Sequence, residues 1–530
     1  MVDPYANFHT LFEELKRKLN SDPEFEKSAK RWTGDIAYTI LPDADFPYLL
    51  RVLFSIEDGK VKDIKITESE SDLIPEFEFV MPHSVFMKIA LGKMNLSLMS
   101  VLRGTIKLKG SKISALRKMK MFKTITENIR RIMKEWQGKN VILLRRKEFM
   151  TPHIIMGENV REILYGIKAK RVLIISGRVI TKLGMVDEIK RLLSESGARI
   201  EVFDESKPET PIEVVDEATR RAHEFRPDLI IGIGGGSTMD LAKAVFAAYE
   251  RPDISLMDID PSWELTLRRK SKLMLIPTTS GTGSESNWVS VVTFKKGDLR
   301  RKEFIVNREL IPDYAISDPH FIYNLPKRLV ASTGLDALTH AFEAFISPWR
   351  NELVYAFSIR ALKLLMKNLP ESYKNGDKDA RAKVHYAATL AGLAFGNSQL
   401  AICHGLGHAL GSLFDIPHGL AVAVFLPYAL DYYKNSAREA LEELAEELRI
   451  DEPDVIDKLR ERMVELISSV NGYTKISDFG ITEEEFNSKV DKLVDLAKKD
   501  PSTYSGSRIP TDMELKTILK CAYTGRHVDI

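Results

Sequence analysis

The chain has 530 residues, more than one hydrophobic core accommodates, so we expect two or three domains. Lys and Arg number 77 against 75 Asp and Glu, and a net charge of +2 argues against a nucleic-acid-binding protein. The two cysteines, Cys403 and Cys521, exclude a disulfide framework and favour a reducing, cytoplasmic compartment.

Hydropathy argues against export and against a membrane span. The N-terminus lacks the apolar segment of a signal peptide, and the longest apolar run, near residues 420–430, is too short to cross a bilayer. The charged share of 29%, with glutamine only at Gln137 and Gln399, is typical of thermophilic proteins.

Residues 1–138 are predicted to form a separate α+β domain. A helix is expected over 8–19, followed by strands over 35–41, 49–56, 61–67 and 76–81. The turn at Asp58-Gly59 is typical of a β-hairpin. A helix beginning at Pro82, a strand over 105–109 and a basic helix over 113–136 complete the domain.

The run EFVMPHSVFMKIALGKMNLSLMSVLRGTIKLKGSKISAL and this order of elements resemble the sterol-carrier-protein-2-like (SCP2-like) lipid-binding domain. The resemblance centres on Gly92, Gly104, Lys107 and Gly110. It implies an apolar tunnel that binds an acyl chain or a similar lipid, and it supplies no catalytic residue.

The basic helix has two interpretations. Its cations could contact anionic lipid headgroups at a membrane surface, or they could form one solvated helix face, which is the commoner case. They are Lys112, Arg117, Lys118, Lys120, Lys123, Arg130, Arg131 and Lys134.

From Arg145 strands and helices alternate, which predicts a parallel sheet. Strands are expected over 171–176, 200–204, 228–233 and 273–276, with one helix over 181–196.

Two loops follow strands of this sheet. Gly234-Gly235-Gly236 would let a pyrophosphate approach the backbone, with Ser237 capping the next helix and Asp240 completing a capping box. A second, hydroxyl-rich loop over 277–285 is expected at the same edge of the sheet. Each loop alone would also suit an ordinary tight turn or helix cap; the pair indicates a ligand site.

Four further residues indicate a metal site. Asp336 and His340 are four residues apart and therefore share one face of a helix. His404 and His418 follow in an apolar stretch that gives imidazoles no reason to be there for solubility. Three imidazoles and a carboxylate suit iron or zinc. The alternative is that all four are ordinary residues of packed helices. That alternative is the better explanation for any one of them, but not for the four together.

The motifs GIGGGSTMDLAKAV, PTTSGTGSE, GLDALTHAFEAF and ICHGLGHALGSLFDIPHGLAVAVFLP resemble the iron-containing (group III) alcohol dehydrogenases, from Phe149 onward. The resemblance implies a Rossmann-like α/β domain over 145–330, an all-helical metal-binding domain over 331–530, and a homo-oligomer. It implies Fe²⁺, or Zn²⁺, at the four metal ligands, with His408 near the nicotinamide. It places NAD(P) on Gly234, Gly235, Gly236, Ser237, Asp240, Thr278, Thr279, Thr282 and Lys302.

One departure from the family pattern bears on the cofactor. NAD-preferring members carry an aspartate where this chain has Gly177 followed by Arg178. An arginine there can pair with a ribose 2′-phosphate, which favours NADP over NAD. Arg178 as a plain surface residue is the alternative. A second departure is Thr210, which stands where the family frequently has an asparagine on the adenine side of the cofactor.

The expected activity is hydride transfer between NAD(P) and an alcohol or aldehyde, long-chain or lipid-derived if the first domain delivers the substrate. Two alternatives are a polyol dehydrogenase and a hydroxyacid–oxoacid transhydrogenase of the same superfamily. A third is a non-enzymatic lipid carrier whose C-terminal domain is only a scaffold. Buried, intact metal ligands argue against the scaffold, because buried polar groups without a task are costly.

Overall fold

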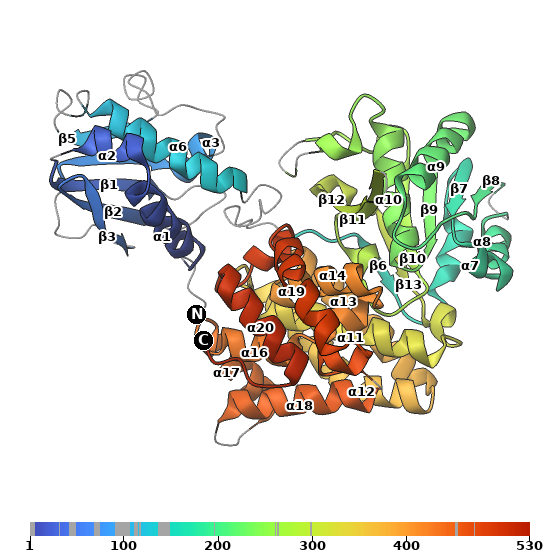
Figure 1. The fold of residues 1–530 in the computed structure, drawn as a ribbon. Helices are drawn as coiled ribbons and strands as arrows, with labels where there is room; N and C mark the ends of the chain where they lie inside the picture. Colours follow the sequence, from blue (N-terminus) through green and yellow to red (C-terminus); the bar gives the residue numbers. More distant parts are fainter. Residues whose placement is uncertain are drawn as a thin grey trace. The chain divides into compact units, whose positions relative to one another are not determined.

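The computed structural model describes residues 6–30, 32–41, 49–67, 75–90, 106–110, 115, 118–135, 149–194, 197–259, 261, 264–296, 299–450, 454–470 and 472–530. They form two compact units, and each is considered by itself (Figure 1). The larger unit comprises Phe149–Ala497 and Asp512–Ile530. The N-terminal unit lies within residues 3–148 and also includes the distant segment Lys498–Thr511.

The N-terminal unit is a five-stranded sheet with helices, ordered β3-β2-β1-β4-β5. Its strands are β1 (Gly34–Leu41), β2 (Leu50–Glu57), β3 (Lys60–Thr67), β4 (Phe77–Pro82) and β5 (Lys107–Gly110). Its helices are α1 (Ala6–Asn20), α2 (Pro23–Ala29), α3 (His83–Ala90) and α6 (Met119–Glu135). The expected β2–β3 hairpin is confirmed, with Asp58 at φ 48° and Gly59 at φ 78°.

Aromatic side chains build the core of this unit. Phe122 of α6 meets the rings of Phe77 and Phe79 edge-on, at centroid distances of 5.5 and 4.8 Å. Several cations of α6 pair with neighbouring acids, Lys120 with Glu24 at 3.2 Å for example. Of the residues that carry the SCP2-like resemblance, Lys107 and Gly110 lie on β5, whereas Gly92 and Gly104 fall outside the described residues.

The larger unit contains a six-stranded parallel sheet in the order β6-β13-β10-β9-β7-β8. The strands are β6 (His153–Met156), β7 (Arg171–Ile175), β8 (Arg199–Phe203), β9 (Leu229–Gly234), β10 (Lys272–Pro277) and β13 (Tyr314–Ser317). Helices α9 (Ile212–Phe225) and α10 (Gly236–Glu250) cover one face of the sheet, and α8 (Met185–Ser194) covers the other. Alternate residues of the strands point to opposite faces, so the sheet contributes to two separate apolar cores.

The strand order reverses between β7 and β9, since the chain builds β8 on one side of β7 and β9 on the other. Open parallel sheets bind ligands outside the carboxyl ends of their strands at such a switch point. Gly177 follows β7 there, and Gly234 ends β9, with Gly235 and Gly236 leading into α10. The fold therefore places both predicted glycine positions at the expected edge.

One element differs from its prediction. The single helix expected over 181–196 is two helices, α7 (Arg178–Lys182) and α8, separated at Gly184, which has φ 79°. A residue in this left-handed region ends a helix, and glycine adopts it without strain. The prediction followed the apolar periodicity and overlooked this local stop signal.

Beyond the sheet, a hairpin and a helical array complete the unit. The hairpin is β11 (Val289–Lys296) with β12 (Leu299–Val306). The first five helices are α11 (Lys327–Ile346), α12 (Glu352–Lys374), α13 (Lys378–Gly396), α14 (Ile402–Phe414) and α15 (His418–Ala423). The rest are α16 (Leu426–Tyr433), α17 (Arg438–Glu447), α18 (Val455–Ser469), α19 (Glu483–Ala497) and α20 (Asp512–Thr524). In Figure 1 they form the yellow to red part of the chain.

The sheet and the helical array meet through two glycines. Gly283, in the loop after β10, has φ 57°, and a Cβ there would lie 2.5 Å from the Cα of Gly392 on α13. No side chain fits on either side of this contact, so the second predicted cofactor loop lies directly against the helical array.

Replacing Gly392 by alanine tests this close approach. In a free helix the change would stabilise by about 1 kcal/mol, so a loss of stability reports the contact alone. We expect a loss of about 1–3 kcal/mol, because the new methyl group meets backbone atoms of Gly283. Chemical denaturation of Gly392→Ala measures it. Gly166→Ala is the control, since nothing lies within 4 Å of a Cβ there, and equal stabilities of the two variants would contradict the contact.

Candidate metal centre

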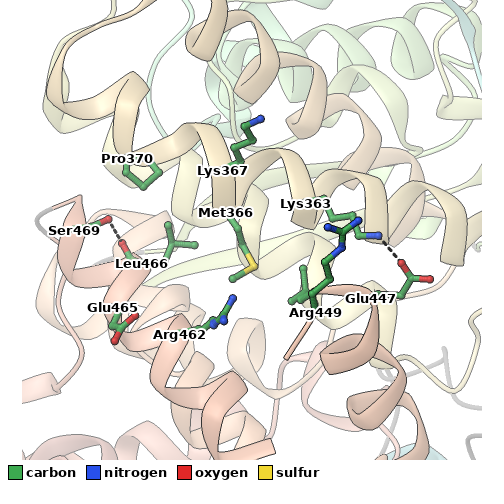
Figure 2. Close-up of a pocket in the computed structure, with 11 residues that line it drawn as sticks. Lys363, Met366, Lys367, Pro370, Glu447, Arg449, Arg462, Glu465, Leu466 and Ser469 are labelled. Atoms are coloured by element: carbon green, nitrogen blue, oxygen red, sulfur yellow. Dashed lines mark hydrogen bonds and ion pairs between the residues drawn. The ribbon is translucent and has the colours of Figure 1, made fainter. Parts of the chain in front are cut away.

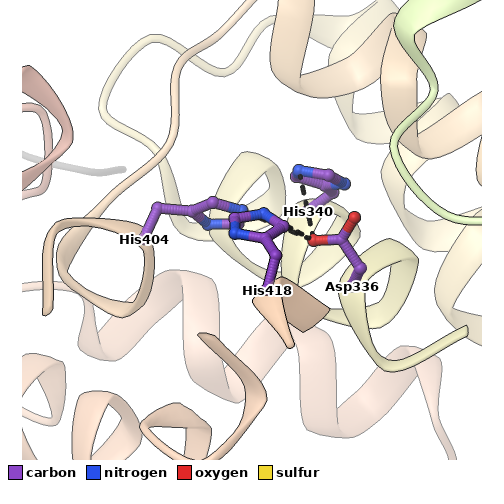
Figure 3. Close-up of side chains that lie close together, drawn as sticks. All are labelled: Asp336, His340, His404 and His418. Carbon is purple, nitrogen blue, oxygen red and sulfur yellow. Dashed lines mark ion pairs between the residues drawn. The ribbon is translucent and has the colours of Figure 1, made fainter. Parts of the chain in front are cut away.

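Three helices bring the four predicted ligands together (Figure 3). Asp336 and His340 lie one turn apart on α11, His404 lies in the first turn of α14, and His418 is the first residue of α15. One ligand atom from each of the four lies within 4.8 Å of every other. The i, i+4 spacing predicted the first pair, and tertiary packing adds the two histidines.

The distances suit a shared ion. The Nε2 atoms of His340, His404 and His418 lie 3.7, 3.8 and 3.2 Å from Asp336 Oδ1. Two ligands that are each about 2.1 Å from a tetrahedrally coordinated ion lie about 3.4 Å apart. Asp336 Oδ1 and His404 Nε2 are buried and make no hydrogen bond within the described chain, as expected of atoms directed at an ion. The residues present therefore fit a divalent metal.

Burial sets the protonation of the cluster. It lowers the pKa of His340 to about 3, so this imidazole is neutral and its lone pair is available. Burial alone would raise the pKa of Asp336, but the surrounding imidazoles hold it well below its usual range. The side chain of His418 is 39% exposed while the other three are nearly enclosed, so the cluster opens on the His418 side.

Glu343 supports the cluster, and the sequence analysis missed it. It is fully buried on α11; its Oε2 lies 2.6 Å from His404 Nδ1, and its Oε1 accepts a 2.6 Å hydrogen bond from the Cys403 N–H. Burial lowers the pKa of His404, but the carboxylates of Glu343 and Asp336 together more than offset this and raise it to about 9. A carboxylate on Nδ1 fixes the imidazole orientation and leaves Nε2 for a metal. The signal was its position, three residues after His340.

A glycine lets α15 reach α11. A Cβ on Gly419 would overlap the carbonyl oxygen of Ser332, and it would lie 3.0 Å from the Cβ of Asp336. Only glycine permits this approach, which brings His418 to the carboxylate.

His408 lies one turn after His404, beside the open side of the cluster. Its ring stacks on that of His418 at 5.1 Å between centroids and faces Phe304 of β12 at 5.6 Å. It is partly exposed and is not one of the four clustered groups. The β11–β12 hairpin therefore contacts helix α14 at His408.

The glycine loop is at the start of α10, but its predicted cap is wrong. Gly235 is the N-cap residue, no side chain caps the helix, and Ser237 lies inside its first turn, where its Oγ accepts a 3.2 Å hydrogen bond from the Glu209 N–H. Asp240 instead accepts hydrogen bonds from Ser284 Oγ at 2.7 Å and the Val291 N–H at 3.2 Å. The uncapped N–H groups of α10 remain directed at the switch point, where an anion would be favoured.

The second loop packs on the first. Thr279 lies 3.4 Å from the position of a Cβ on Gly235, and Thr282 lies 2.6 Å from one on Gly236. Thr278 is buried at the end of β10, with its N–H donated to the Gly234 carbonyl. The loops therefore form one surface, as their position after neighbouring strands predicted.

Lys243 links α10, the helix that follows the glycine loop, to the second loop. No sequence motif singled this residue out. It is fully buried on α10, and its Nζ donates to Ser284 Oγ, Asn287 Oδ1 and the Val289 carbonyl at 2.9, 3.1 and 2.8 Å. Burial lowers its pKa to about 8, against the opposing effect of Asp240 and Glu285. A buried ammonium with these three acceptors fixes the second loop and the start of β11 against α10.

The remaining predicted cofactor residues lie outside the two loops, after β7 and on β12. Arg178 begins α7, its side chain is 70% exposed, and it approaches Glu205 at 3.8 Å. Gly177 pairs with Glu205 through a β-bridge. Lys302, on β12, is paired with Glu209 at 3.0 Å. Neither cation lies in the metal cluster.

A surface groove of about 790 Å³ between α12 and α18 shares no residue with this site (Figure 2). Met366, Leu448 and Leu466 form its apolar lining, with Lys363 paired to Glu447 at its edge. The chemistry is in the His and Asp cluster instead.

Comparison with known proteins identifies the family. The model described as "Iron-containing alcohol dehydrogenase" matches residues 152–319, and "Fe-containing alcohol dehydrogenase family, C-terminal" matches 330–523. The chain is 34% identical over 381 residues to the NADPH-dependent butanol dehydrogenase of Clostridium saccharobutylicum, covering 71% of this chain and 97% of that protein. The chain belongs to the iron-containing alcohol dehydrogenase family.

Two further similarities agree. The bifunctional aldehyde-alcohol dehydrogenase AdhE of Escherichia coli K12 is 36% identical over 389 residues, 67% of this chain but 43% of AdhE. The structure of an iron-containing alcohol dehydrogenase from Thermococcus thioreducens aligns with a TM-score of 0.66 and 33% identity, over 72% of this chain and 100% of that one.

As a member of this family the chain is an oxidoreductase with a candidate metal site, and NAD(P) is the cofactor the family implies. Both family matches begin after residue 151, beyond the first 138 residues where the sequence predicted an SCP2-like domain. Within the described ranges, the helices are too short or too polar to span a membrane.

Replacing Glu343 by glutamine tests its role behind His404. The change keeps the size of the side chain but removes the charge facing Nδ1, so we expect roughly 10–100-fold weaker metal affinity. Competition with a chelator, followed by metal analysis of the purified variant, measures this. Glu484→Gln, on an exposed turn of α19, should bind metal like the wild type. Unchanged affinity in Glu343→Gln would contradict the role.

Replacing Lys243 by methionine tests the link between the loops. The variant removes the donor to Ser284 Oγ, Asn287 Oδ1 and the Val289 carbonyl and buries Asp240 without its neighbouring cation, so we expect a loss of about 3–5 kcal/mol in unfolding free energy. Denaturant titration measures it, with the exposed Lys168→Met as control. If Lys243→Met lowers the unfolding free energy no more than Lys168→Met does, the arrangement of the loops does not depend on the Lys243 ammonium.

Proposed function

We propose that this member of the family interconverts alcohols and aldehydes with NADP(H), using a divalent metal held by Asp336, His340, His404 and His418. One observation carries the proposal: four ligand atoms within 4.8 Å lie in the helical half. The second loop reaches the same helix, since Gly281 packs against Thr333, three residues before Asp336.

Each residue has a task in this scheme. The metal, when bound, acts as a Lewis acid on the substrate oxygen, and NADP(H) accepts or supplies the hydride. The three imidazoles and the ionised Asp336 hold the cation, and Glu343 orients His404. His408, partly exposed beside His418, is placed to receive or return the proton of the substrate hydroxyl through water.

The two loops supply the cofactor surface. Gly234, Gly235 and Gly236 with the uncapped start of α10 bind the pyrophosphate, while Ser237 bonds to Glu209 and Asp240 to the second loop. Thr278, Thr279 and Thr282 line the other side, and Lys302 contacts the cofactor from β12. Iron is the metal that the family name implies, and zinc fits the same donors.

The direct test combines metal analysis with an NADPH and NADH assay on the purified full-length protein. We expect one bound divalent metal per chain and NADPH-dependent reduction of straight-chain aldehydes that is lost on chelation and restored by Fe²⁺. A panel with polyols and hydroxyacids, with and without added nicotinamide, separates the dehydrogenase from a transhydrogenase. A metal-loaded enzyme that neither reduces any of these aldehydes nor oxidises the corresponding alcohols with either cofactor would end the proposal.

The cofactor preference rests on Gly177 and Arg178. Gly177 leaves room at the carboxyl end of β7, and the exposed guanidinium of Arg178 can pair with a 2′-phosphate there. The NADPH-dependent butanol dehydrogenase, a relative 34% identical, fits the same preference.

Replacing Arg178 by alanine separates the two cofactors. We expect the KM for NADPH to rise about tenfold while that for NADH stays constant, because only NADPH presents the phosphate. Steady-state kinetics with each cofactor measure the ratio. Lys182→Ala, at the other end of α7, is the matched control. An equal change for both cofactors would place Arg178 outside phosphate recognition.

For the N-terminal unit we propose an acyl-chain ligand, on the strength of its order of elements and its apolar core. Such a unit would extend the accepted substrates toward long-chain aldehydes. A graded aldehyde series tests this: turnover should increase with chain length, and an optimum at the shortest members would count against the delivery of lipid-derived substrates.

A further inference from the structure

The connection between α19 and α20 is longer than the two helices require. Phe486 near the start of α19 stacks on Tyr523 near the end of α20 at 4.4 Å, and Lys516 pairs with Asp491 at 2.7 Å. The helices are therefore antiparallel neighbours, which connections of about 2–8 residues usually join. This chain uses fourteen residues, Lys498–Thr511.

These residues belong to the N-terminal unit. Lys498–Thr511 groups with residues 3–148, although residues Phe149–Ala497 of the larger unit separate the two in sequence. Tyr504 and Ile509 are 5% and 7% exposed, and both are part of the apolar core that contains Phe12, Phe54 and Phe122. The dehydrogenase part of the chain thus contributes two apolar side chains to this core.

The segment is rich in hydroxyl groups, whose burial costs free energy unless they are hydrogen-bonded. Several of its polar groups bond within the segment itself. Its 3₁₀ turn, Pro501–Tyr504, is capped by Asp500, which accepts from the Ser502 N–H at 2.9 Å. Ser505 Oγ donates to the Pro501 carbonyl at 2.9 Å. Prolines at 501 and 510 restrict the unfolded segment and reduce the entropy lost on docking.

We propose that Lys498–Thr511 is an intramolecular docking segment, and that the N-terminal unit completes its apolar core only when this segment is bound. The partner that the N-terminal core accepts is thus a hydroxyl-rich segment of the same chain, presenting Tyr504 and Ile509. Because the segment continues into helices of the larger unit at both ends, the N-terminal unit is not a detachable carrier module.

The same segment gives the N-terminal core a route to the metal-binding helices. α19 packs against α14, where Lys489 Nζ lies 4.7 Å from the centre of the Phe414 ring. α14 carries His404 and His408. A change in the N-terminal core that releases the segment therefore reaches α19, the helix that packs on α14.

Trypsin cleavage after Arg508 in the full-length protein tests the docking. Cleavage of a buried segment follows the population in which it is open. We expect Phe122→Ala, in the N-terminal core, to speed cleavage at Arg508 by at least about tenfold, and the milder Phe122→Leu to give an intermediate rate. Val245→Ala, a buried change in the nucleotide half of the larger unit, is the matched control and should leave the rate unchanged.

The reciprocal experiment starts from the segment. Tyr504→Ala combined with Ile509→Ala should speed hydrogen exchange of the α6 amides about tenfold or more, because the core loses two buried side chains. Met513→Ala, just beyond the segment and 77% exposed, should exchange like the wild type.

Each outcome decides the proposal. Faster cleavage in the Phe122 variants and faster α6 exchange in the double variant support it, even if Phe122→Ala leaves the N-terminal unit wholly unfolded. Cleavage that responds to Val245→Ala and not to Phe122, or α6 exchange that ignores the double variant, overturns it. Failure of the NADPH assay would bear on the metal centre and leave these readouts intact.

Discussion

The buried carboxylate of Asp336 is the constraint on which the structure depends. At 2% exposure, an ionised carboxylate is tolerated only if positive charge faces it. Three imidazoles converge on it from three helices, and Glu343 behind His404 adds a second buried carboxylate. Two buried carboxylates and three imidazoles that converge on one point suit a divalent cation.

Packing makes this convergence possible. Gly419 allows α15 to touch α11, and the Gly283–Gly392 contact seats the second cofactor loop on α13. Lys243 ties that loop to the start of α10. The nucleotide half and the metal half are therefore held in register by contacts that tolerate no extra atoms, which suits a reaction in which hydride must pass between two bound groups.

The N-terminal unit is an addition to this family scaffold, and its connection is unusual. Its apolar core includes residues from both ends of the sequence, Phe12 and Tyr504 among them. A unit built in this way folds and opens together with a segment of its neighbour. The packing of Tyr504 and Ile509 therefore bears on the stability of the whole N-terminal core.

The sequence by itself determined the features that are local along the chain. The spacing of Asp336 and His340, the glycines that end β9, and the Asp58-Gly59 hairpin all follow from periodicity and backbone preference. It failed where a local pattern had two solutions: Ser237 and Asp240 resemble a capping box, yet Asp240 bonds to Ser284.

Only the tertiary structure decided which distant groups meet. Glu343 becomes important because α14 lies across α11, and Lys243 because two loops close over it. The segment Lys498–Thr511 gave no signal at all, since hydroxyls and prolines between helices are ordinary loop composition. The physical reason is common to these cases: a side chain's neighbours along a helix are set by its period, whereas its partners across the fold depend on packing that no short stretch of sequence contains.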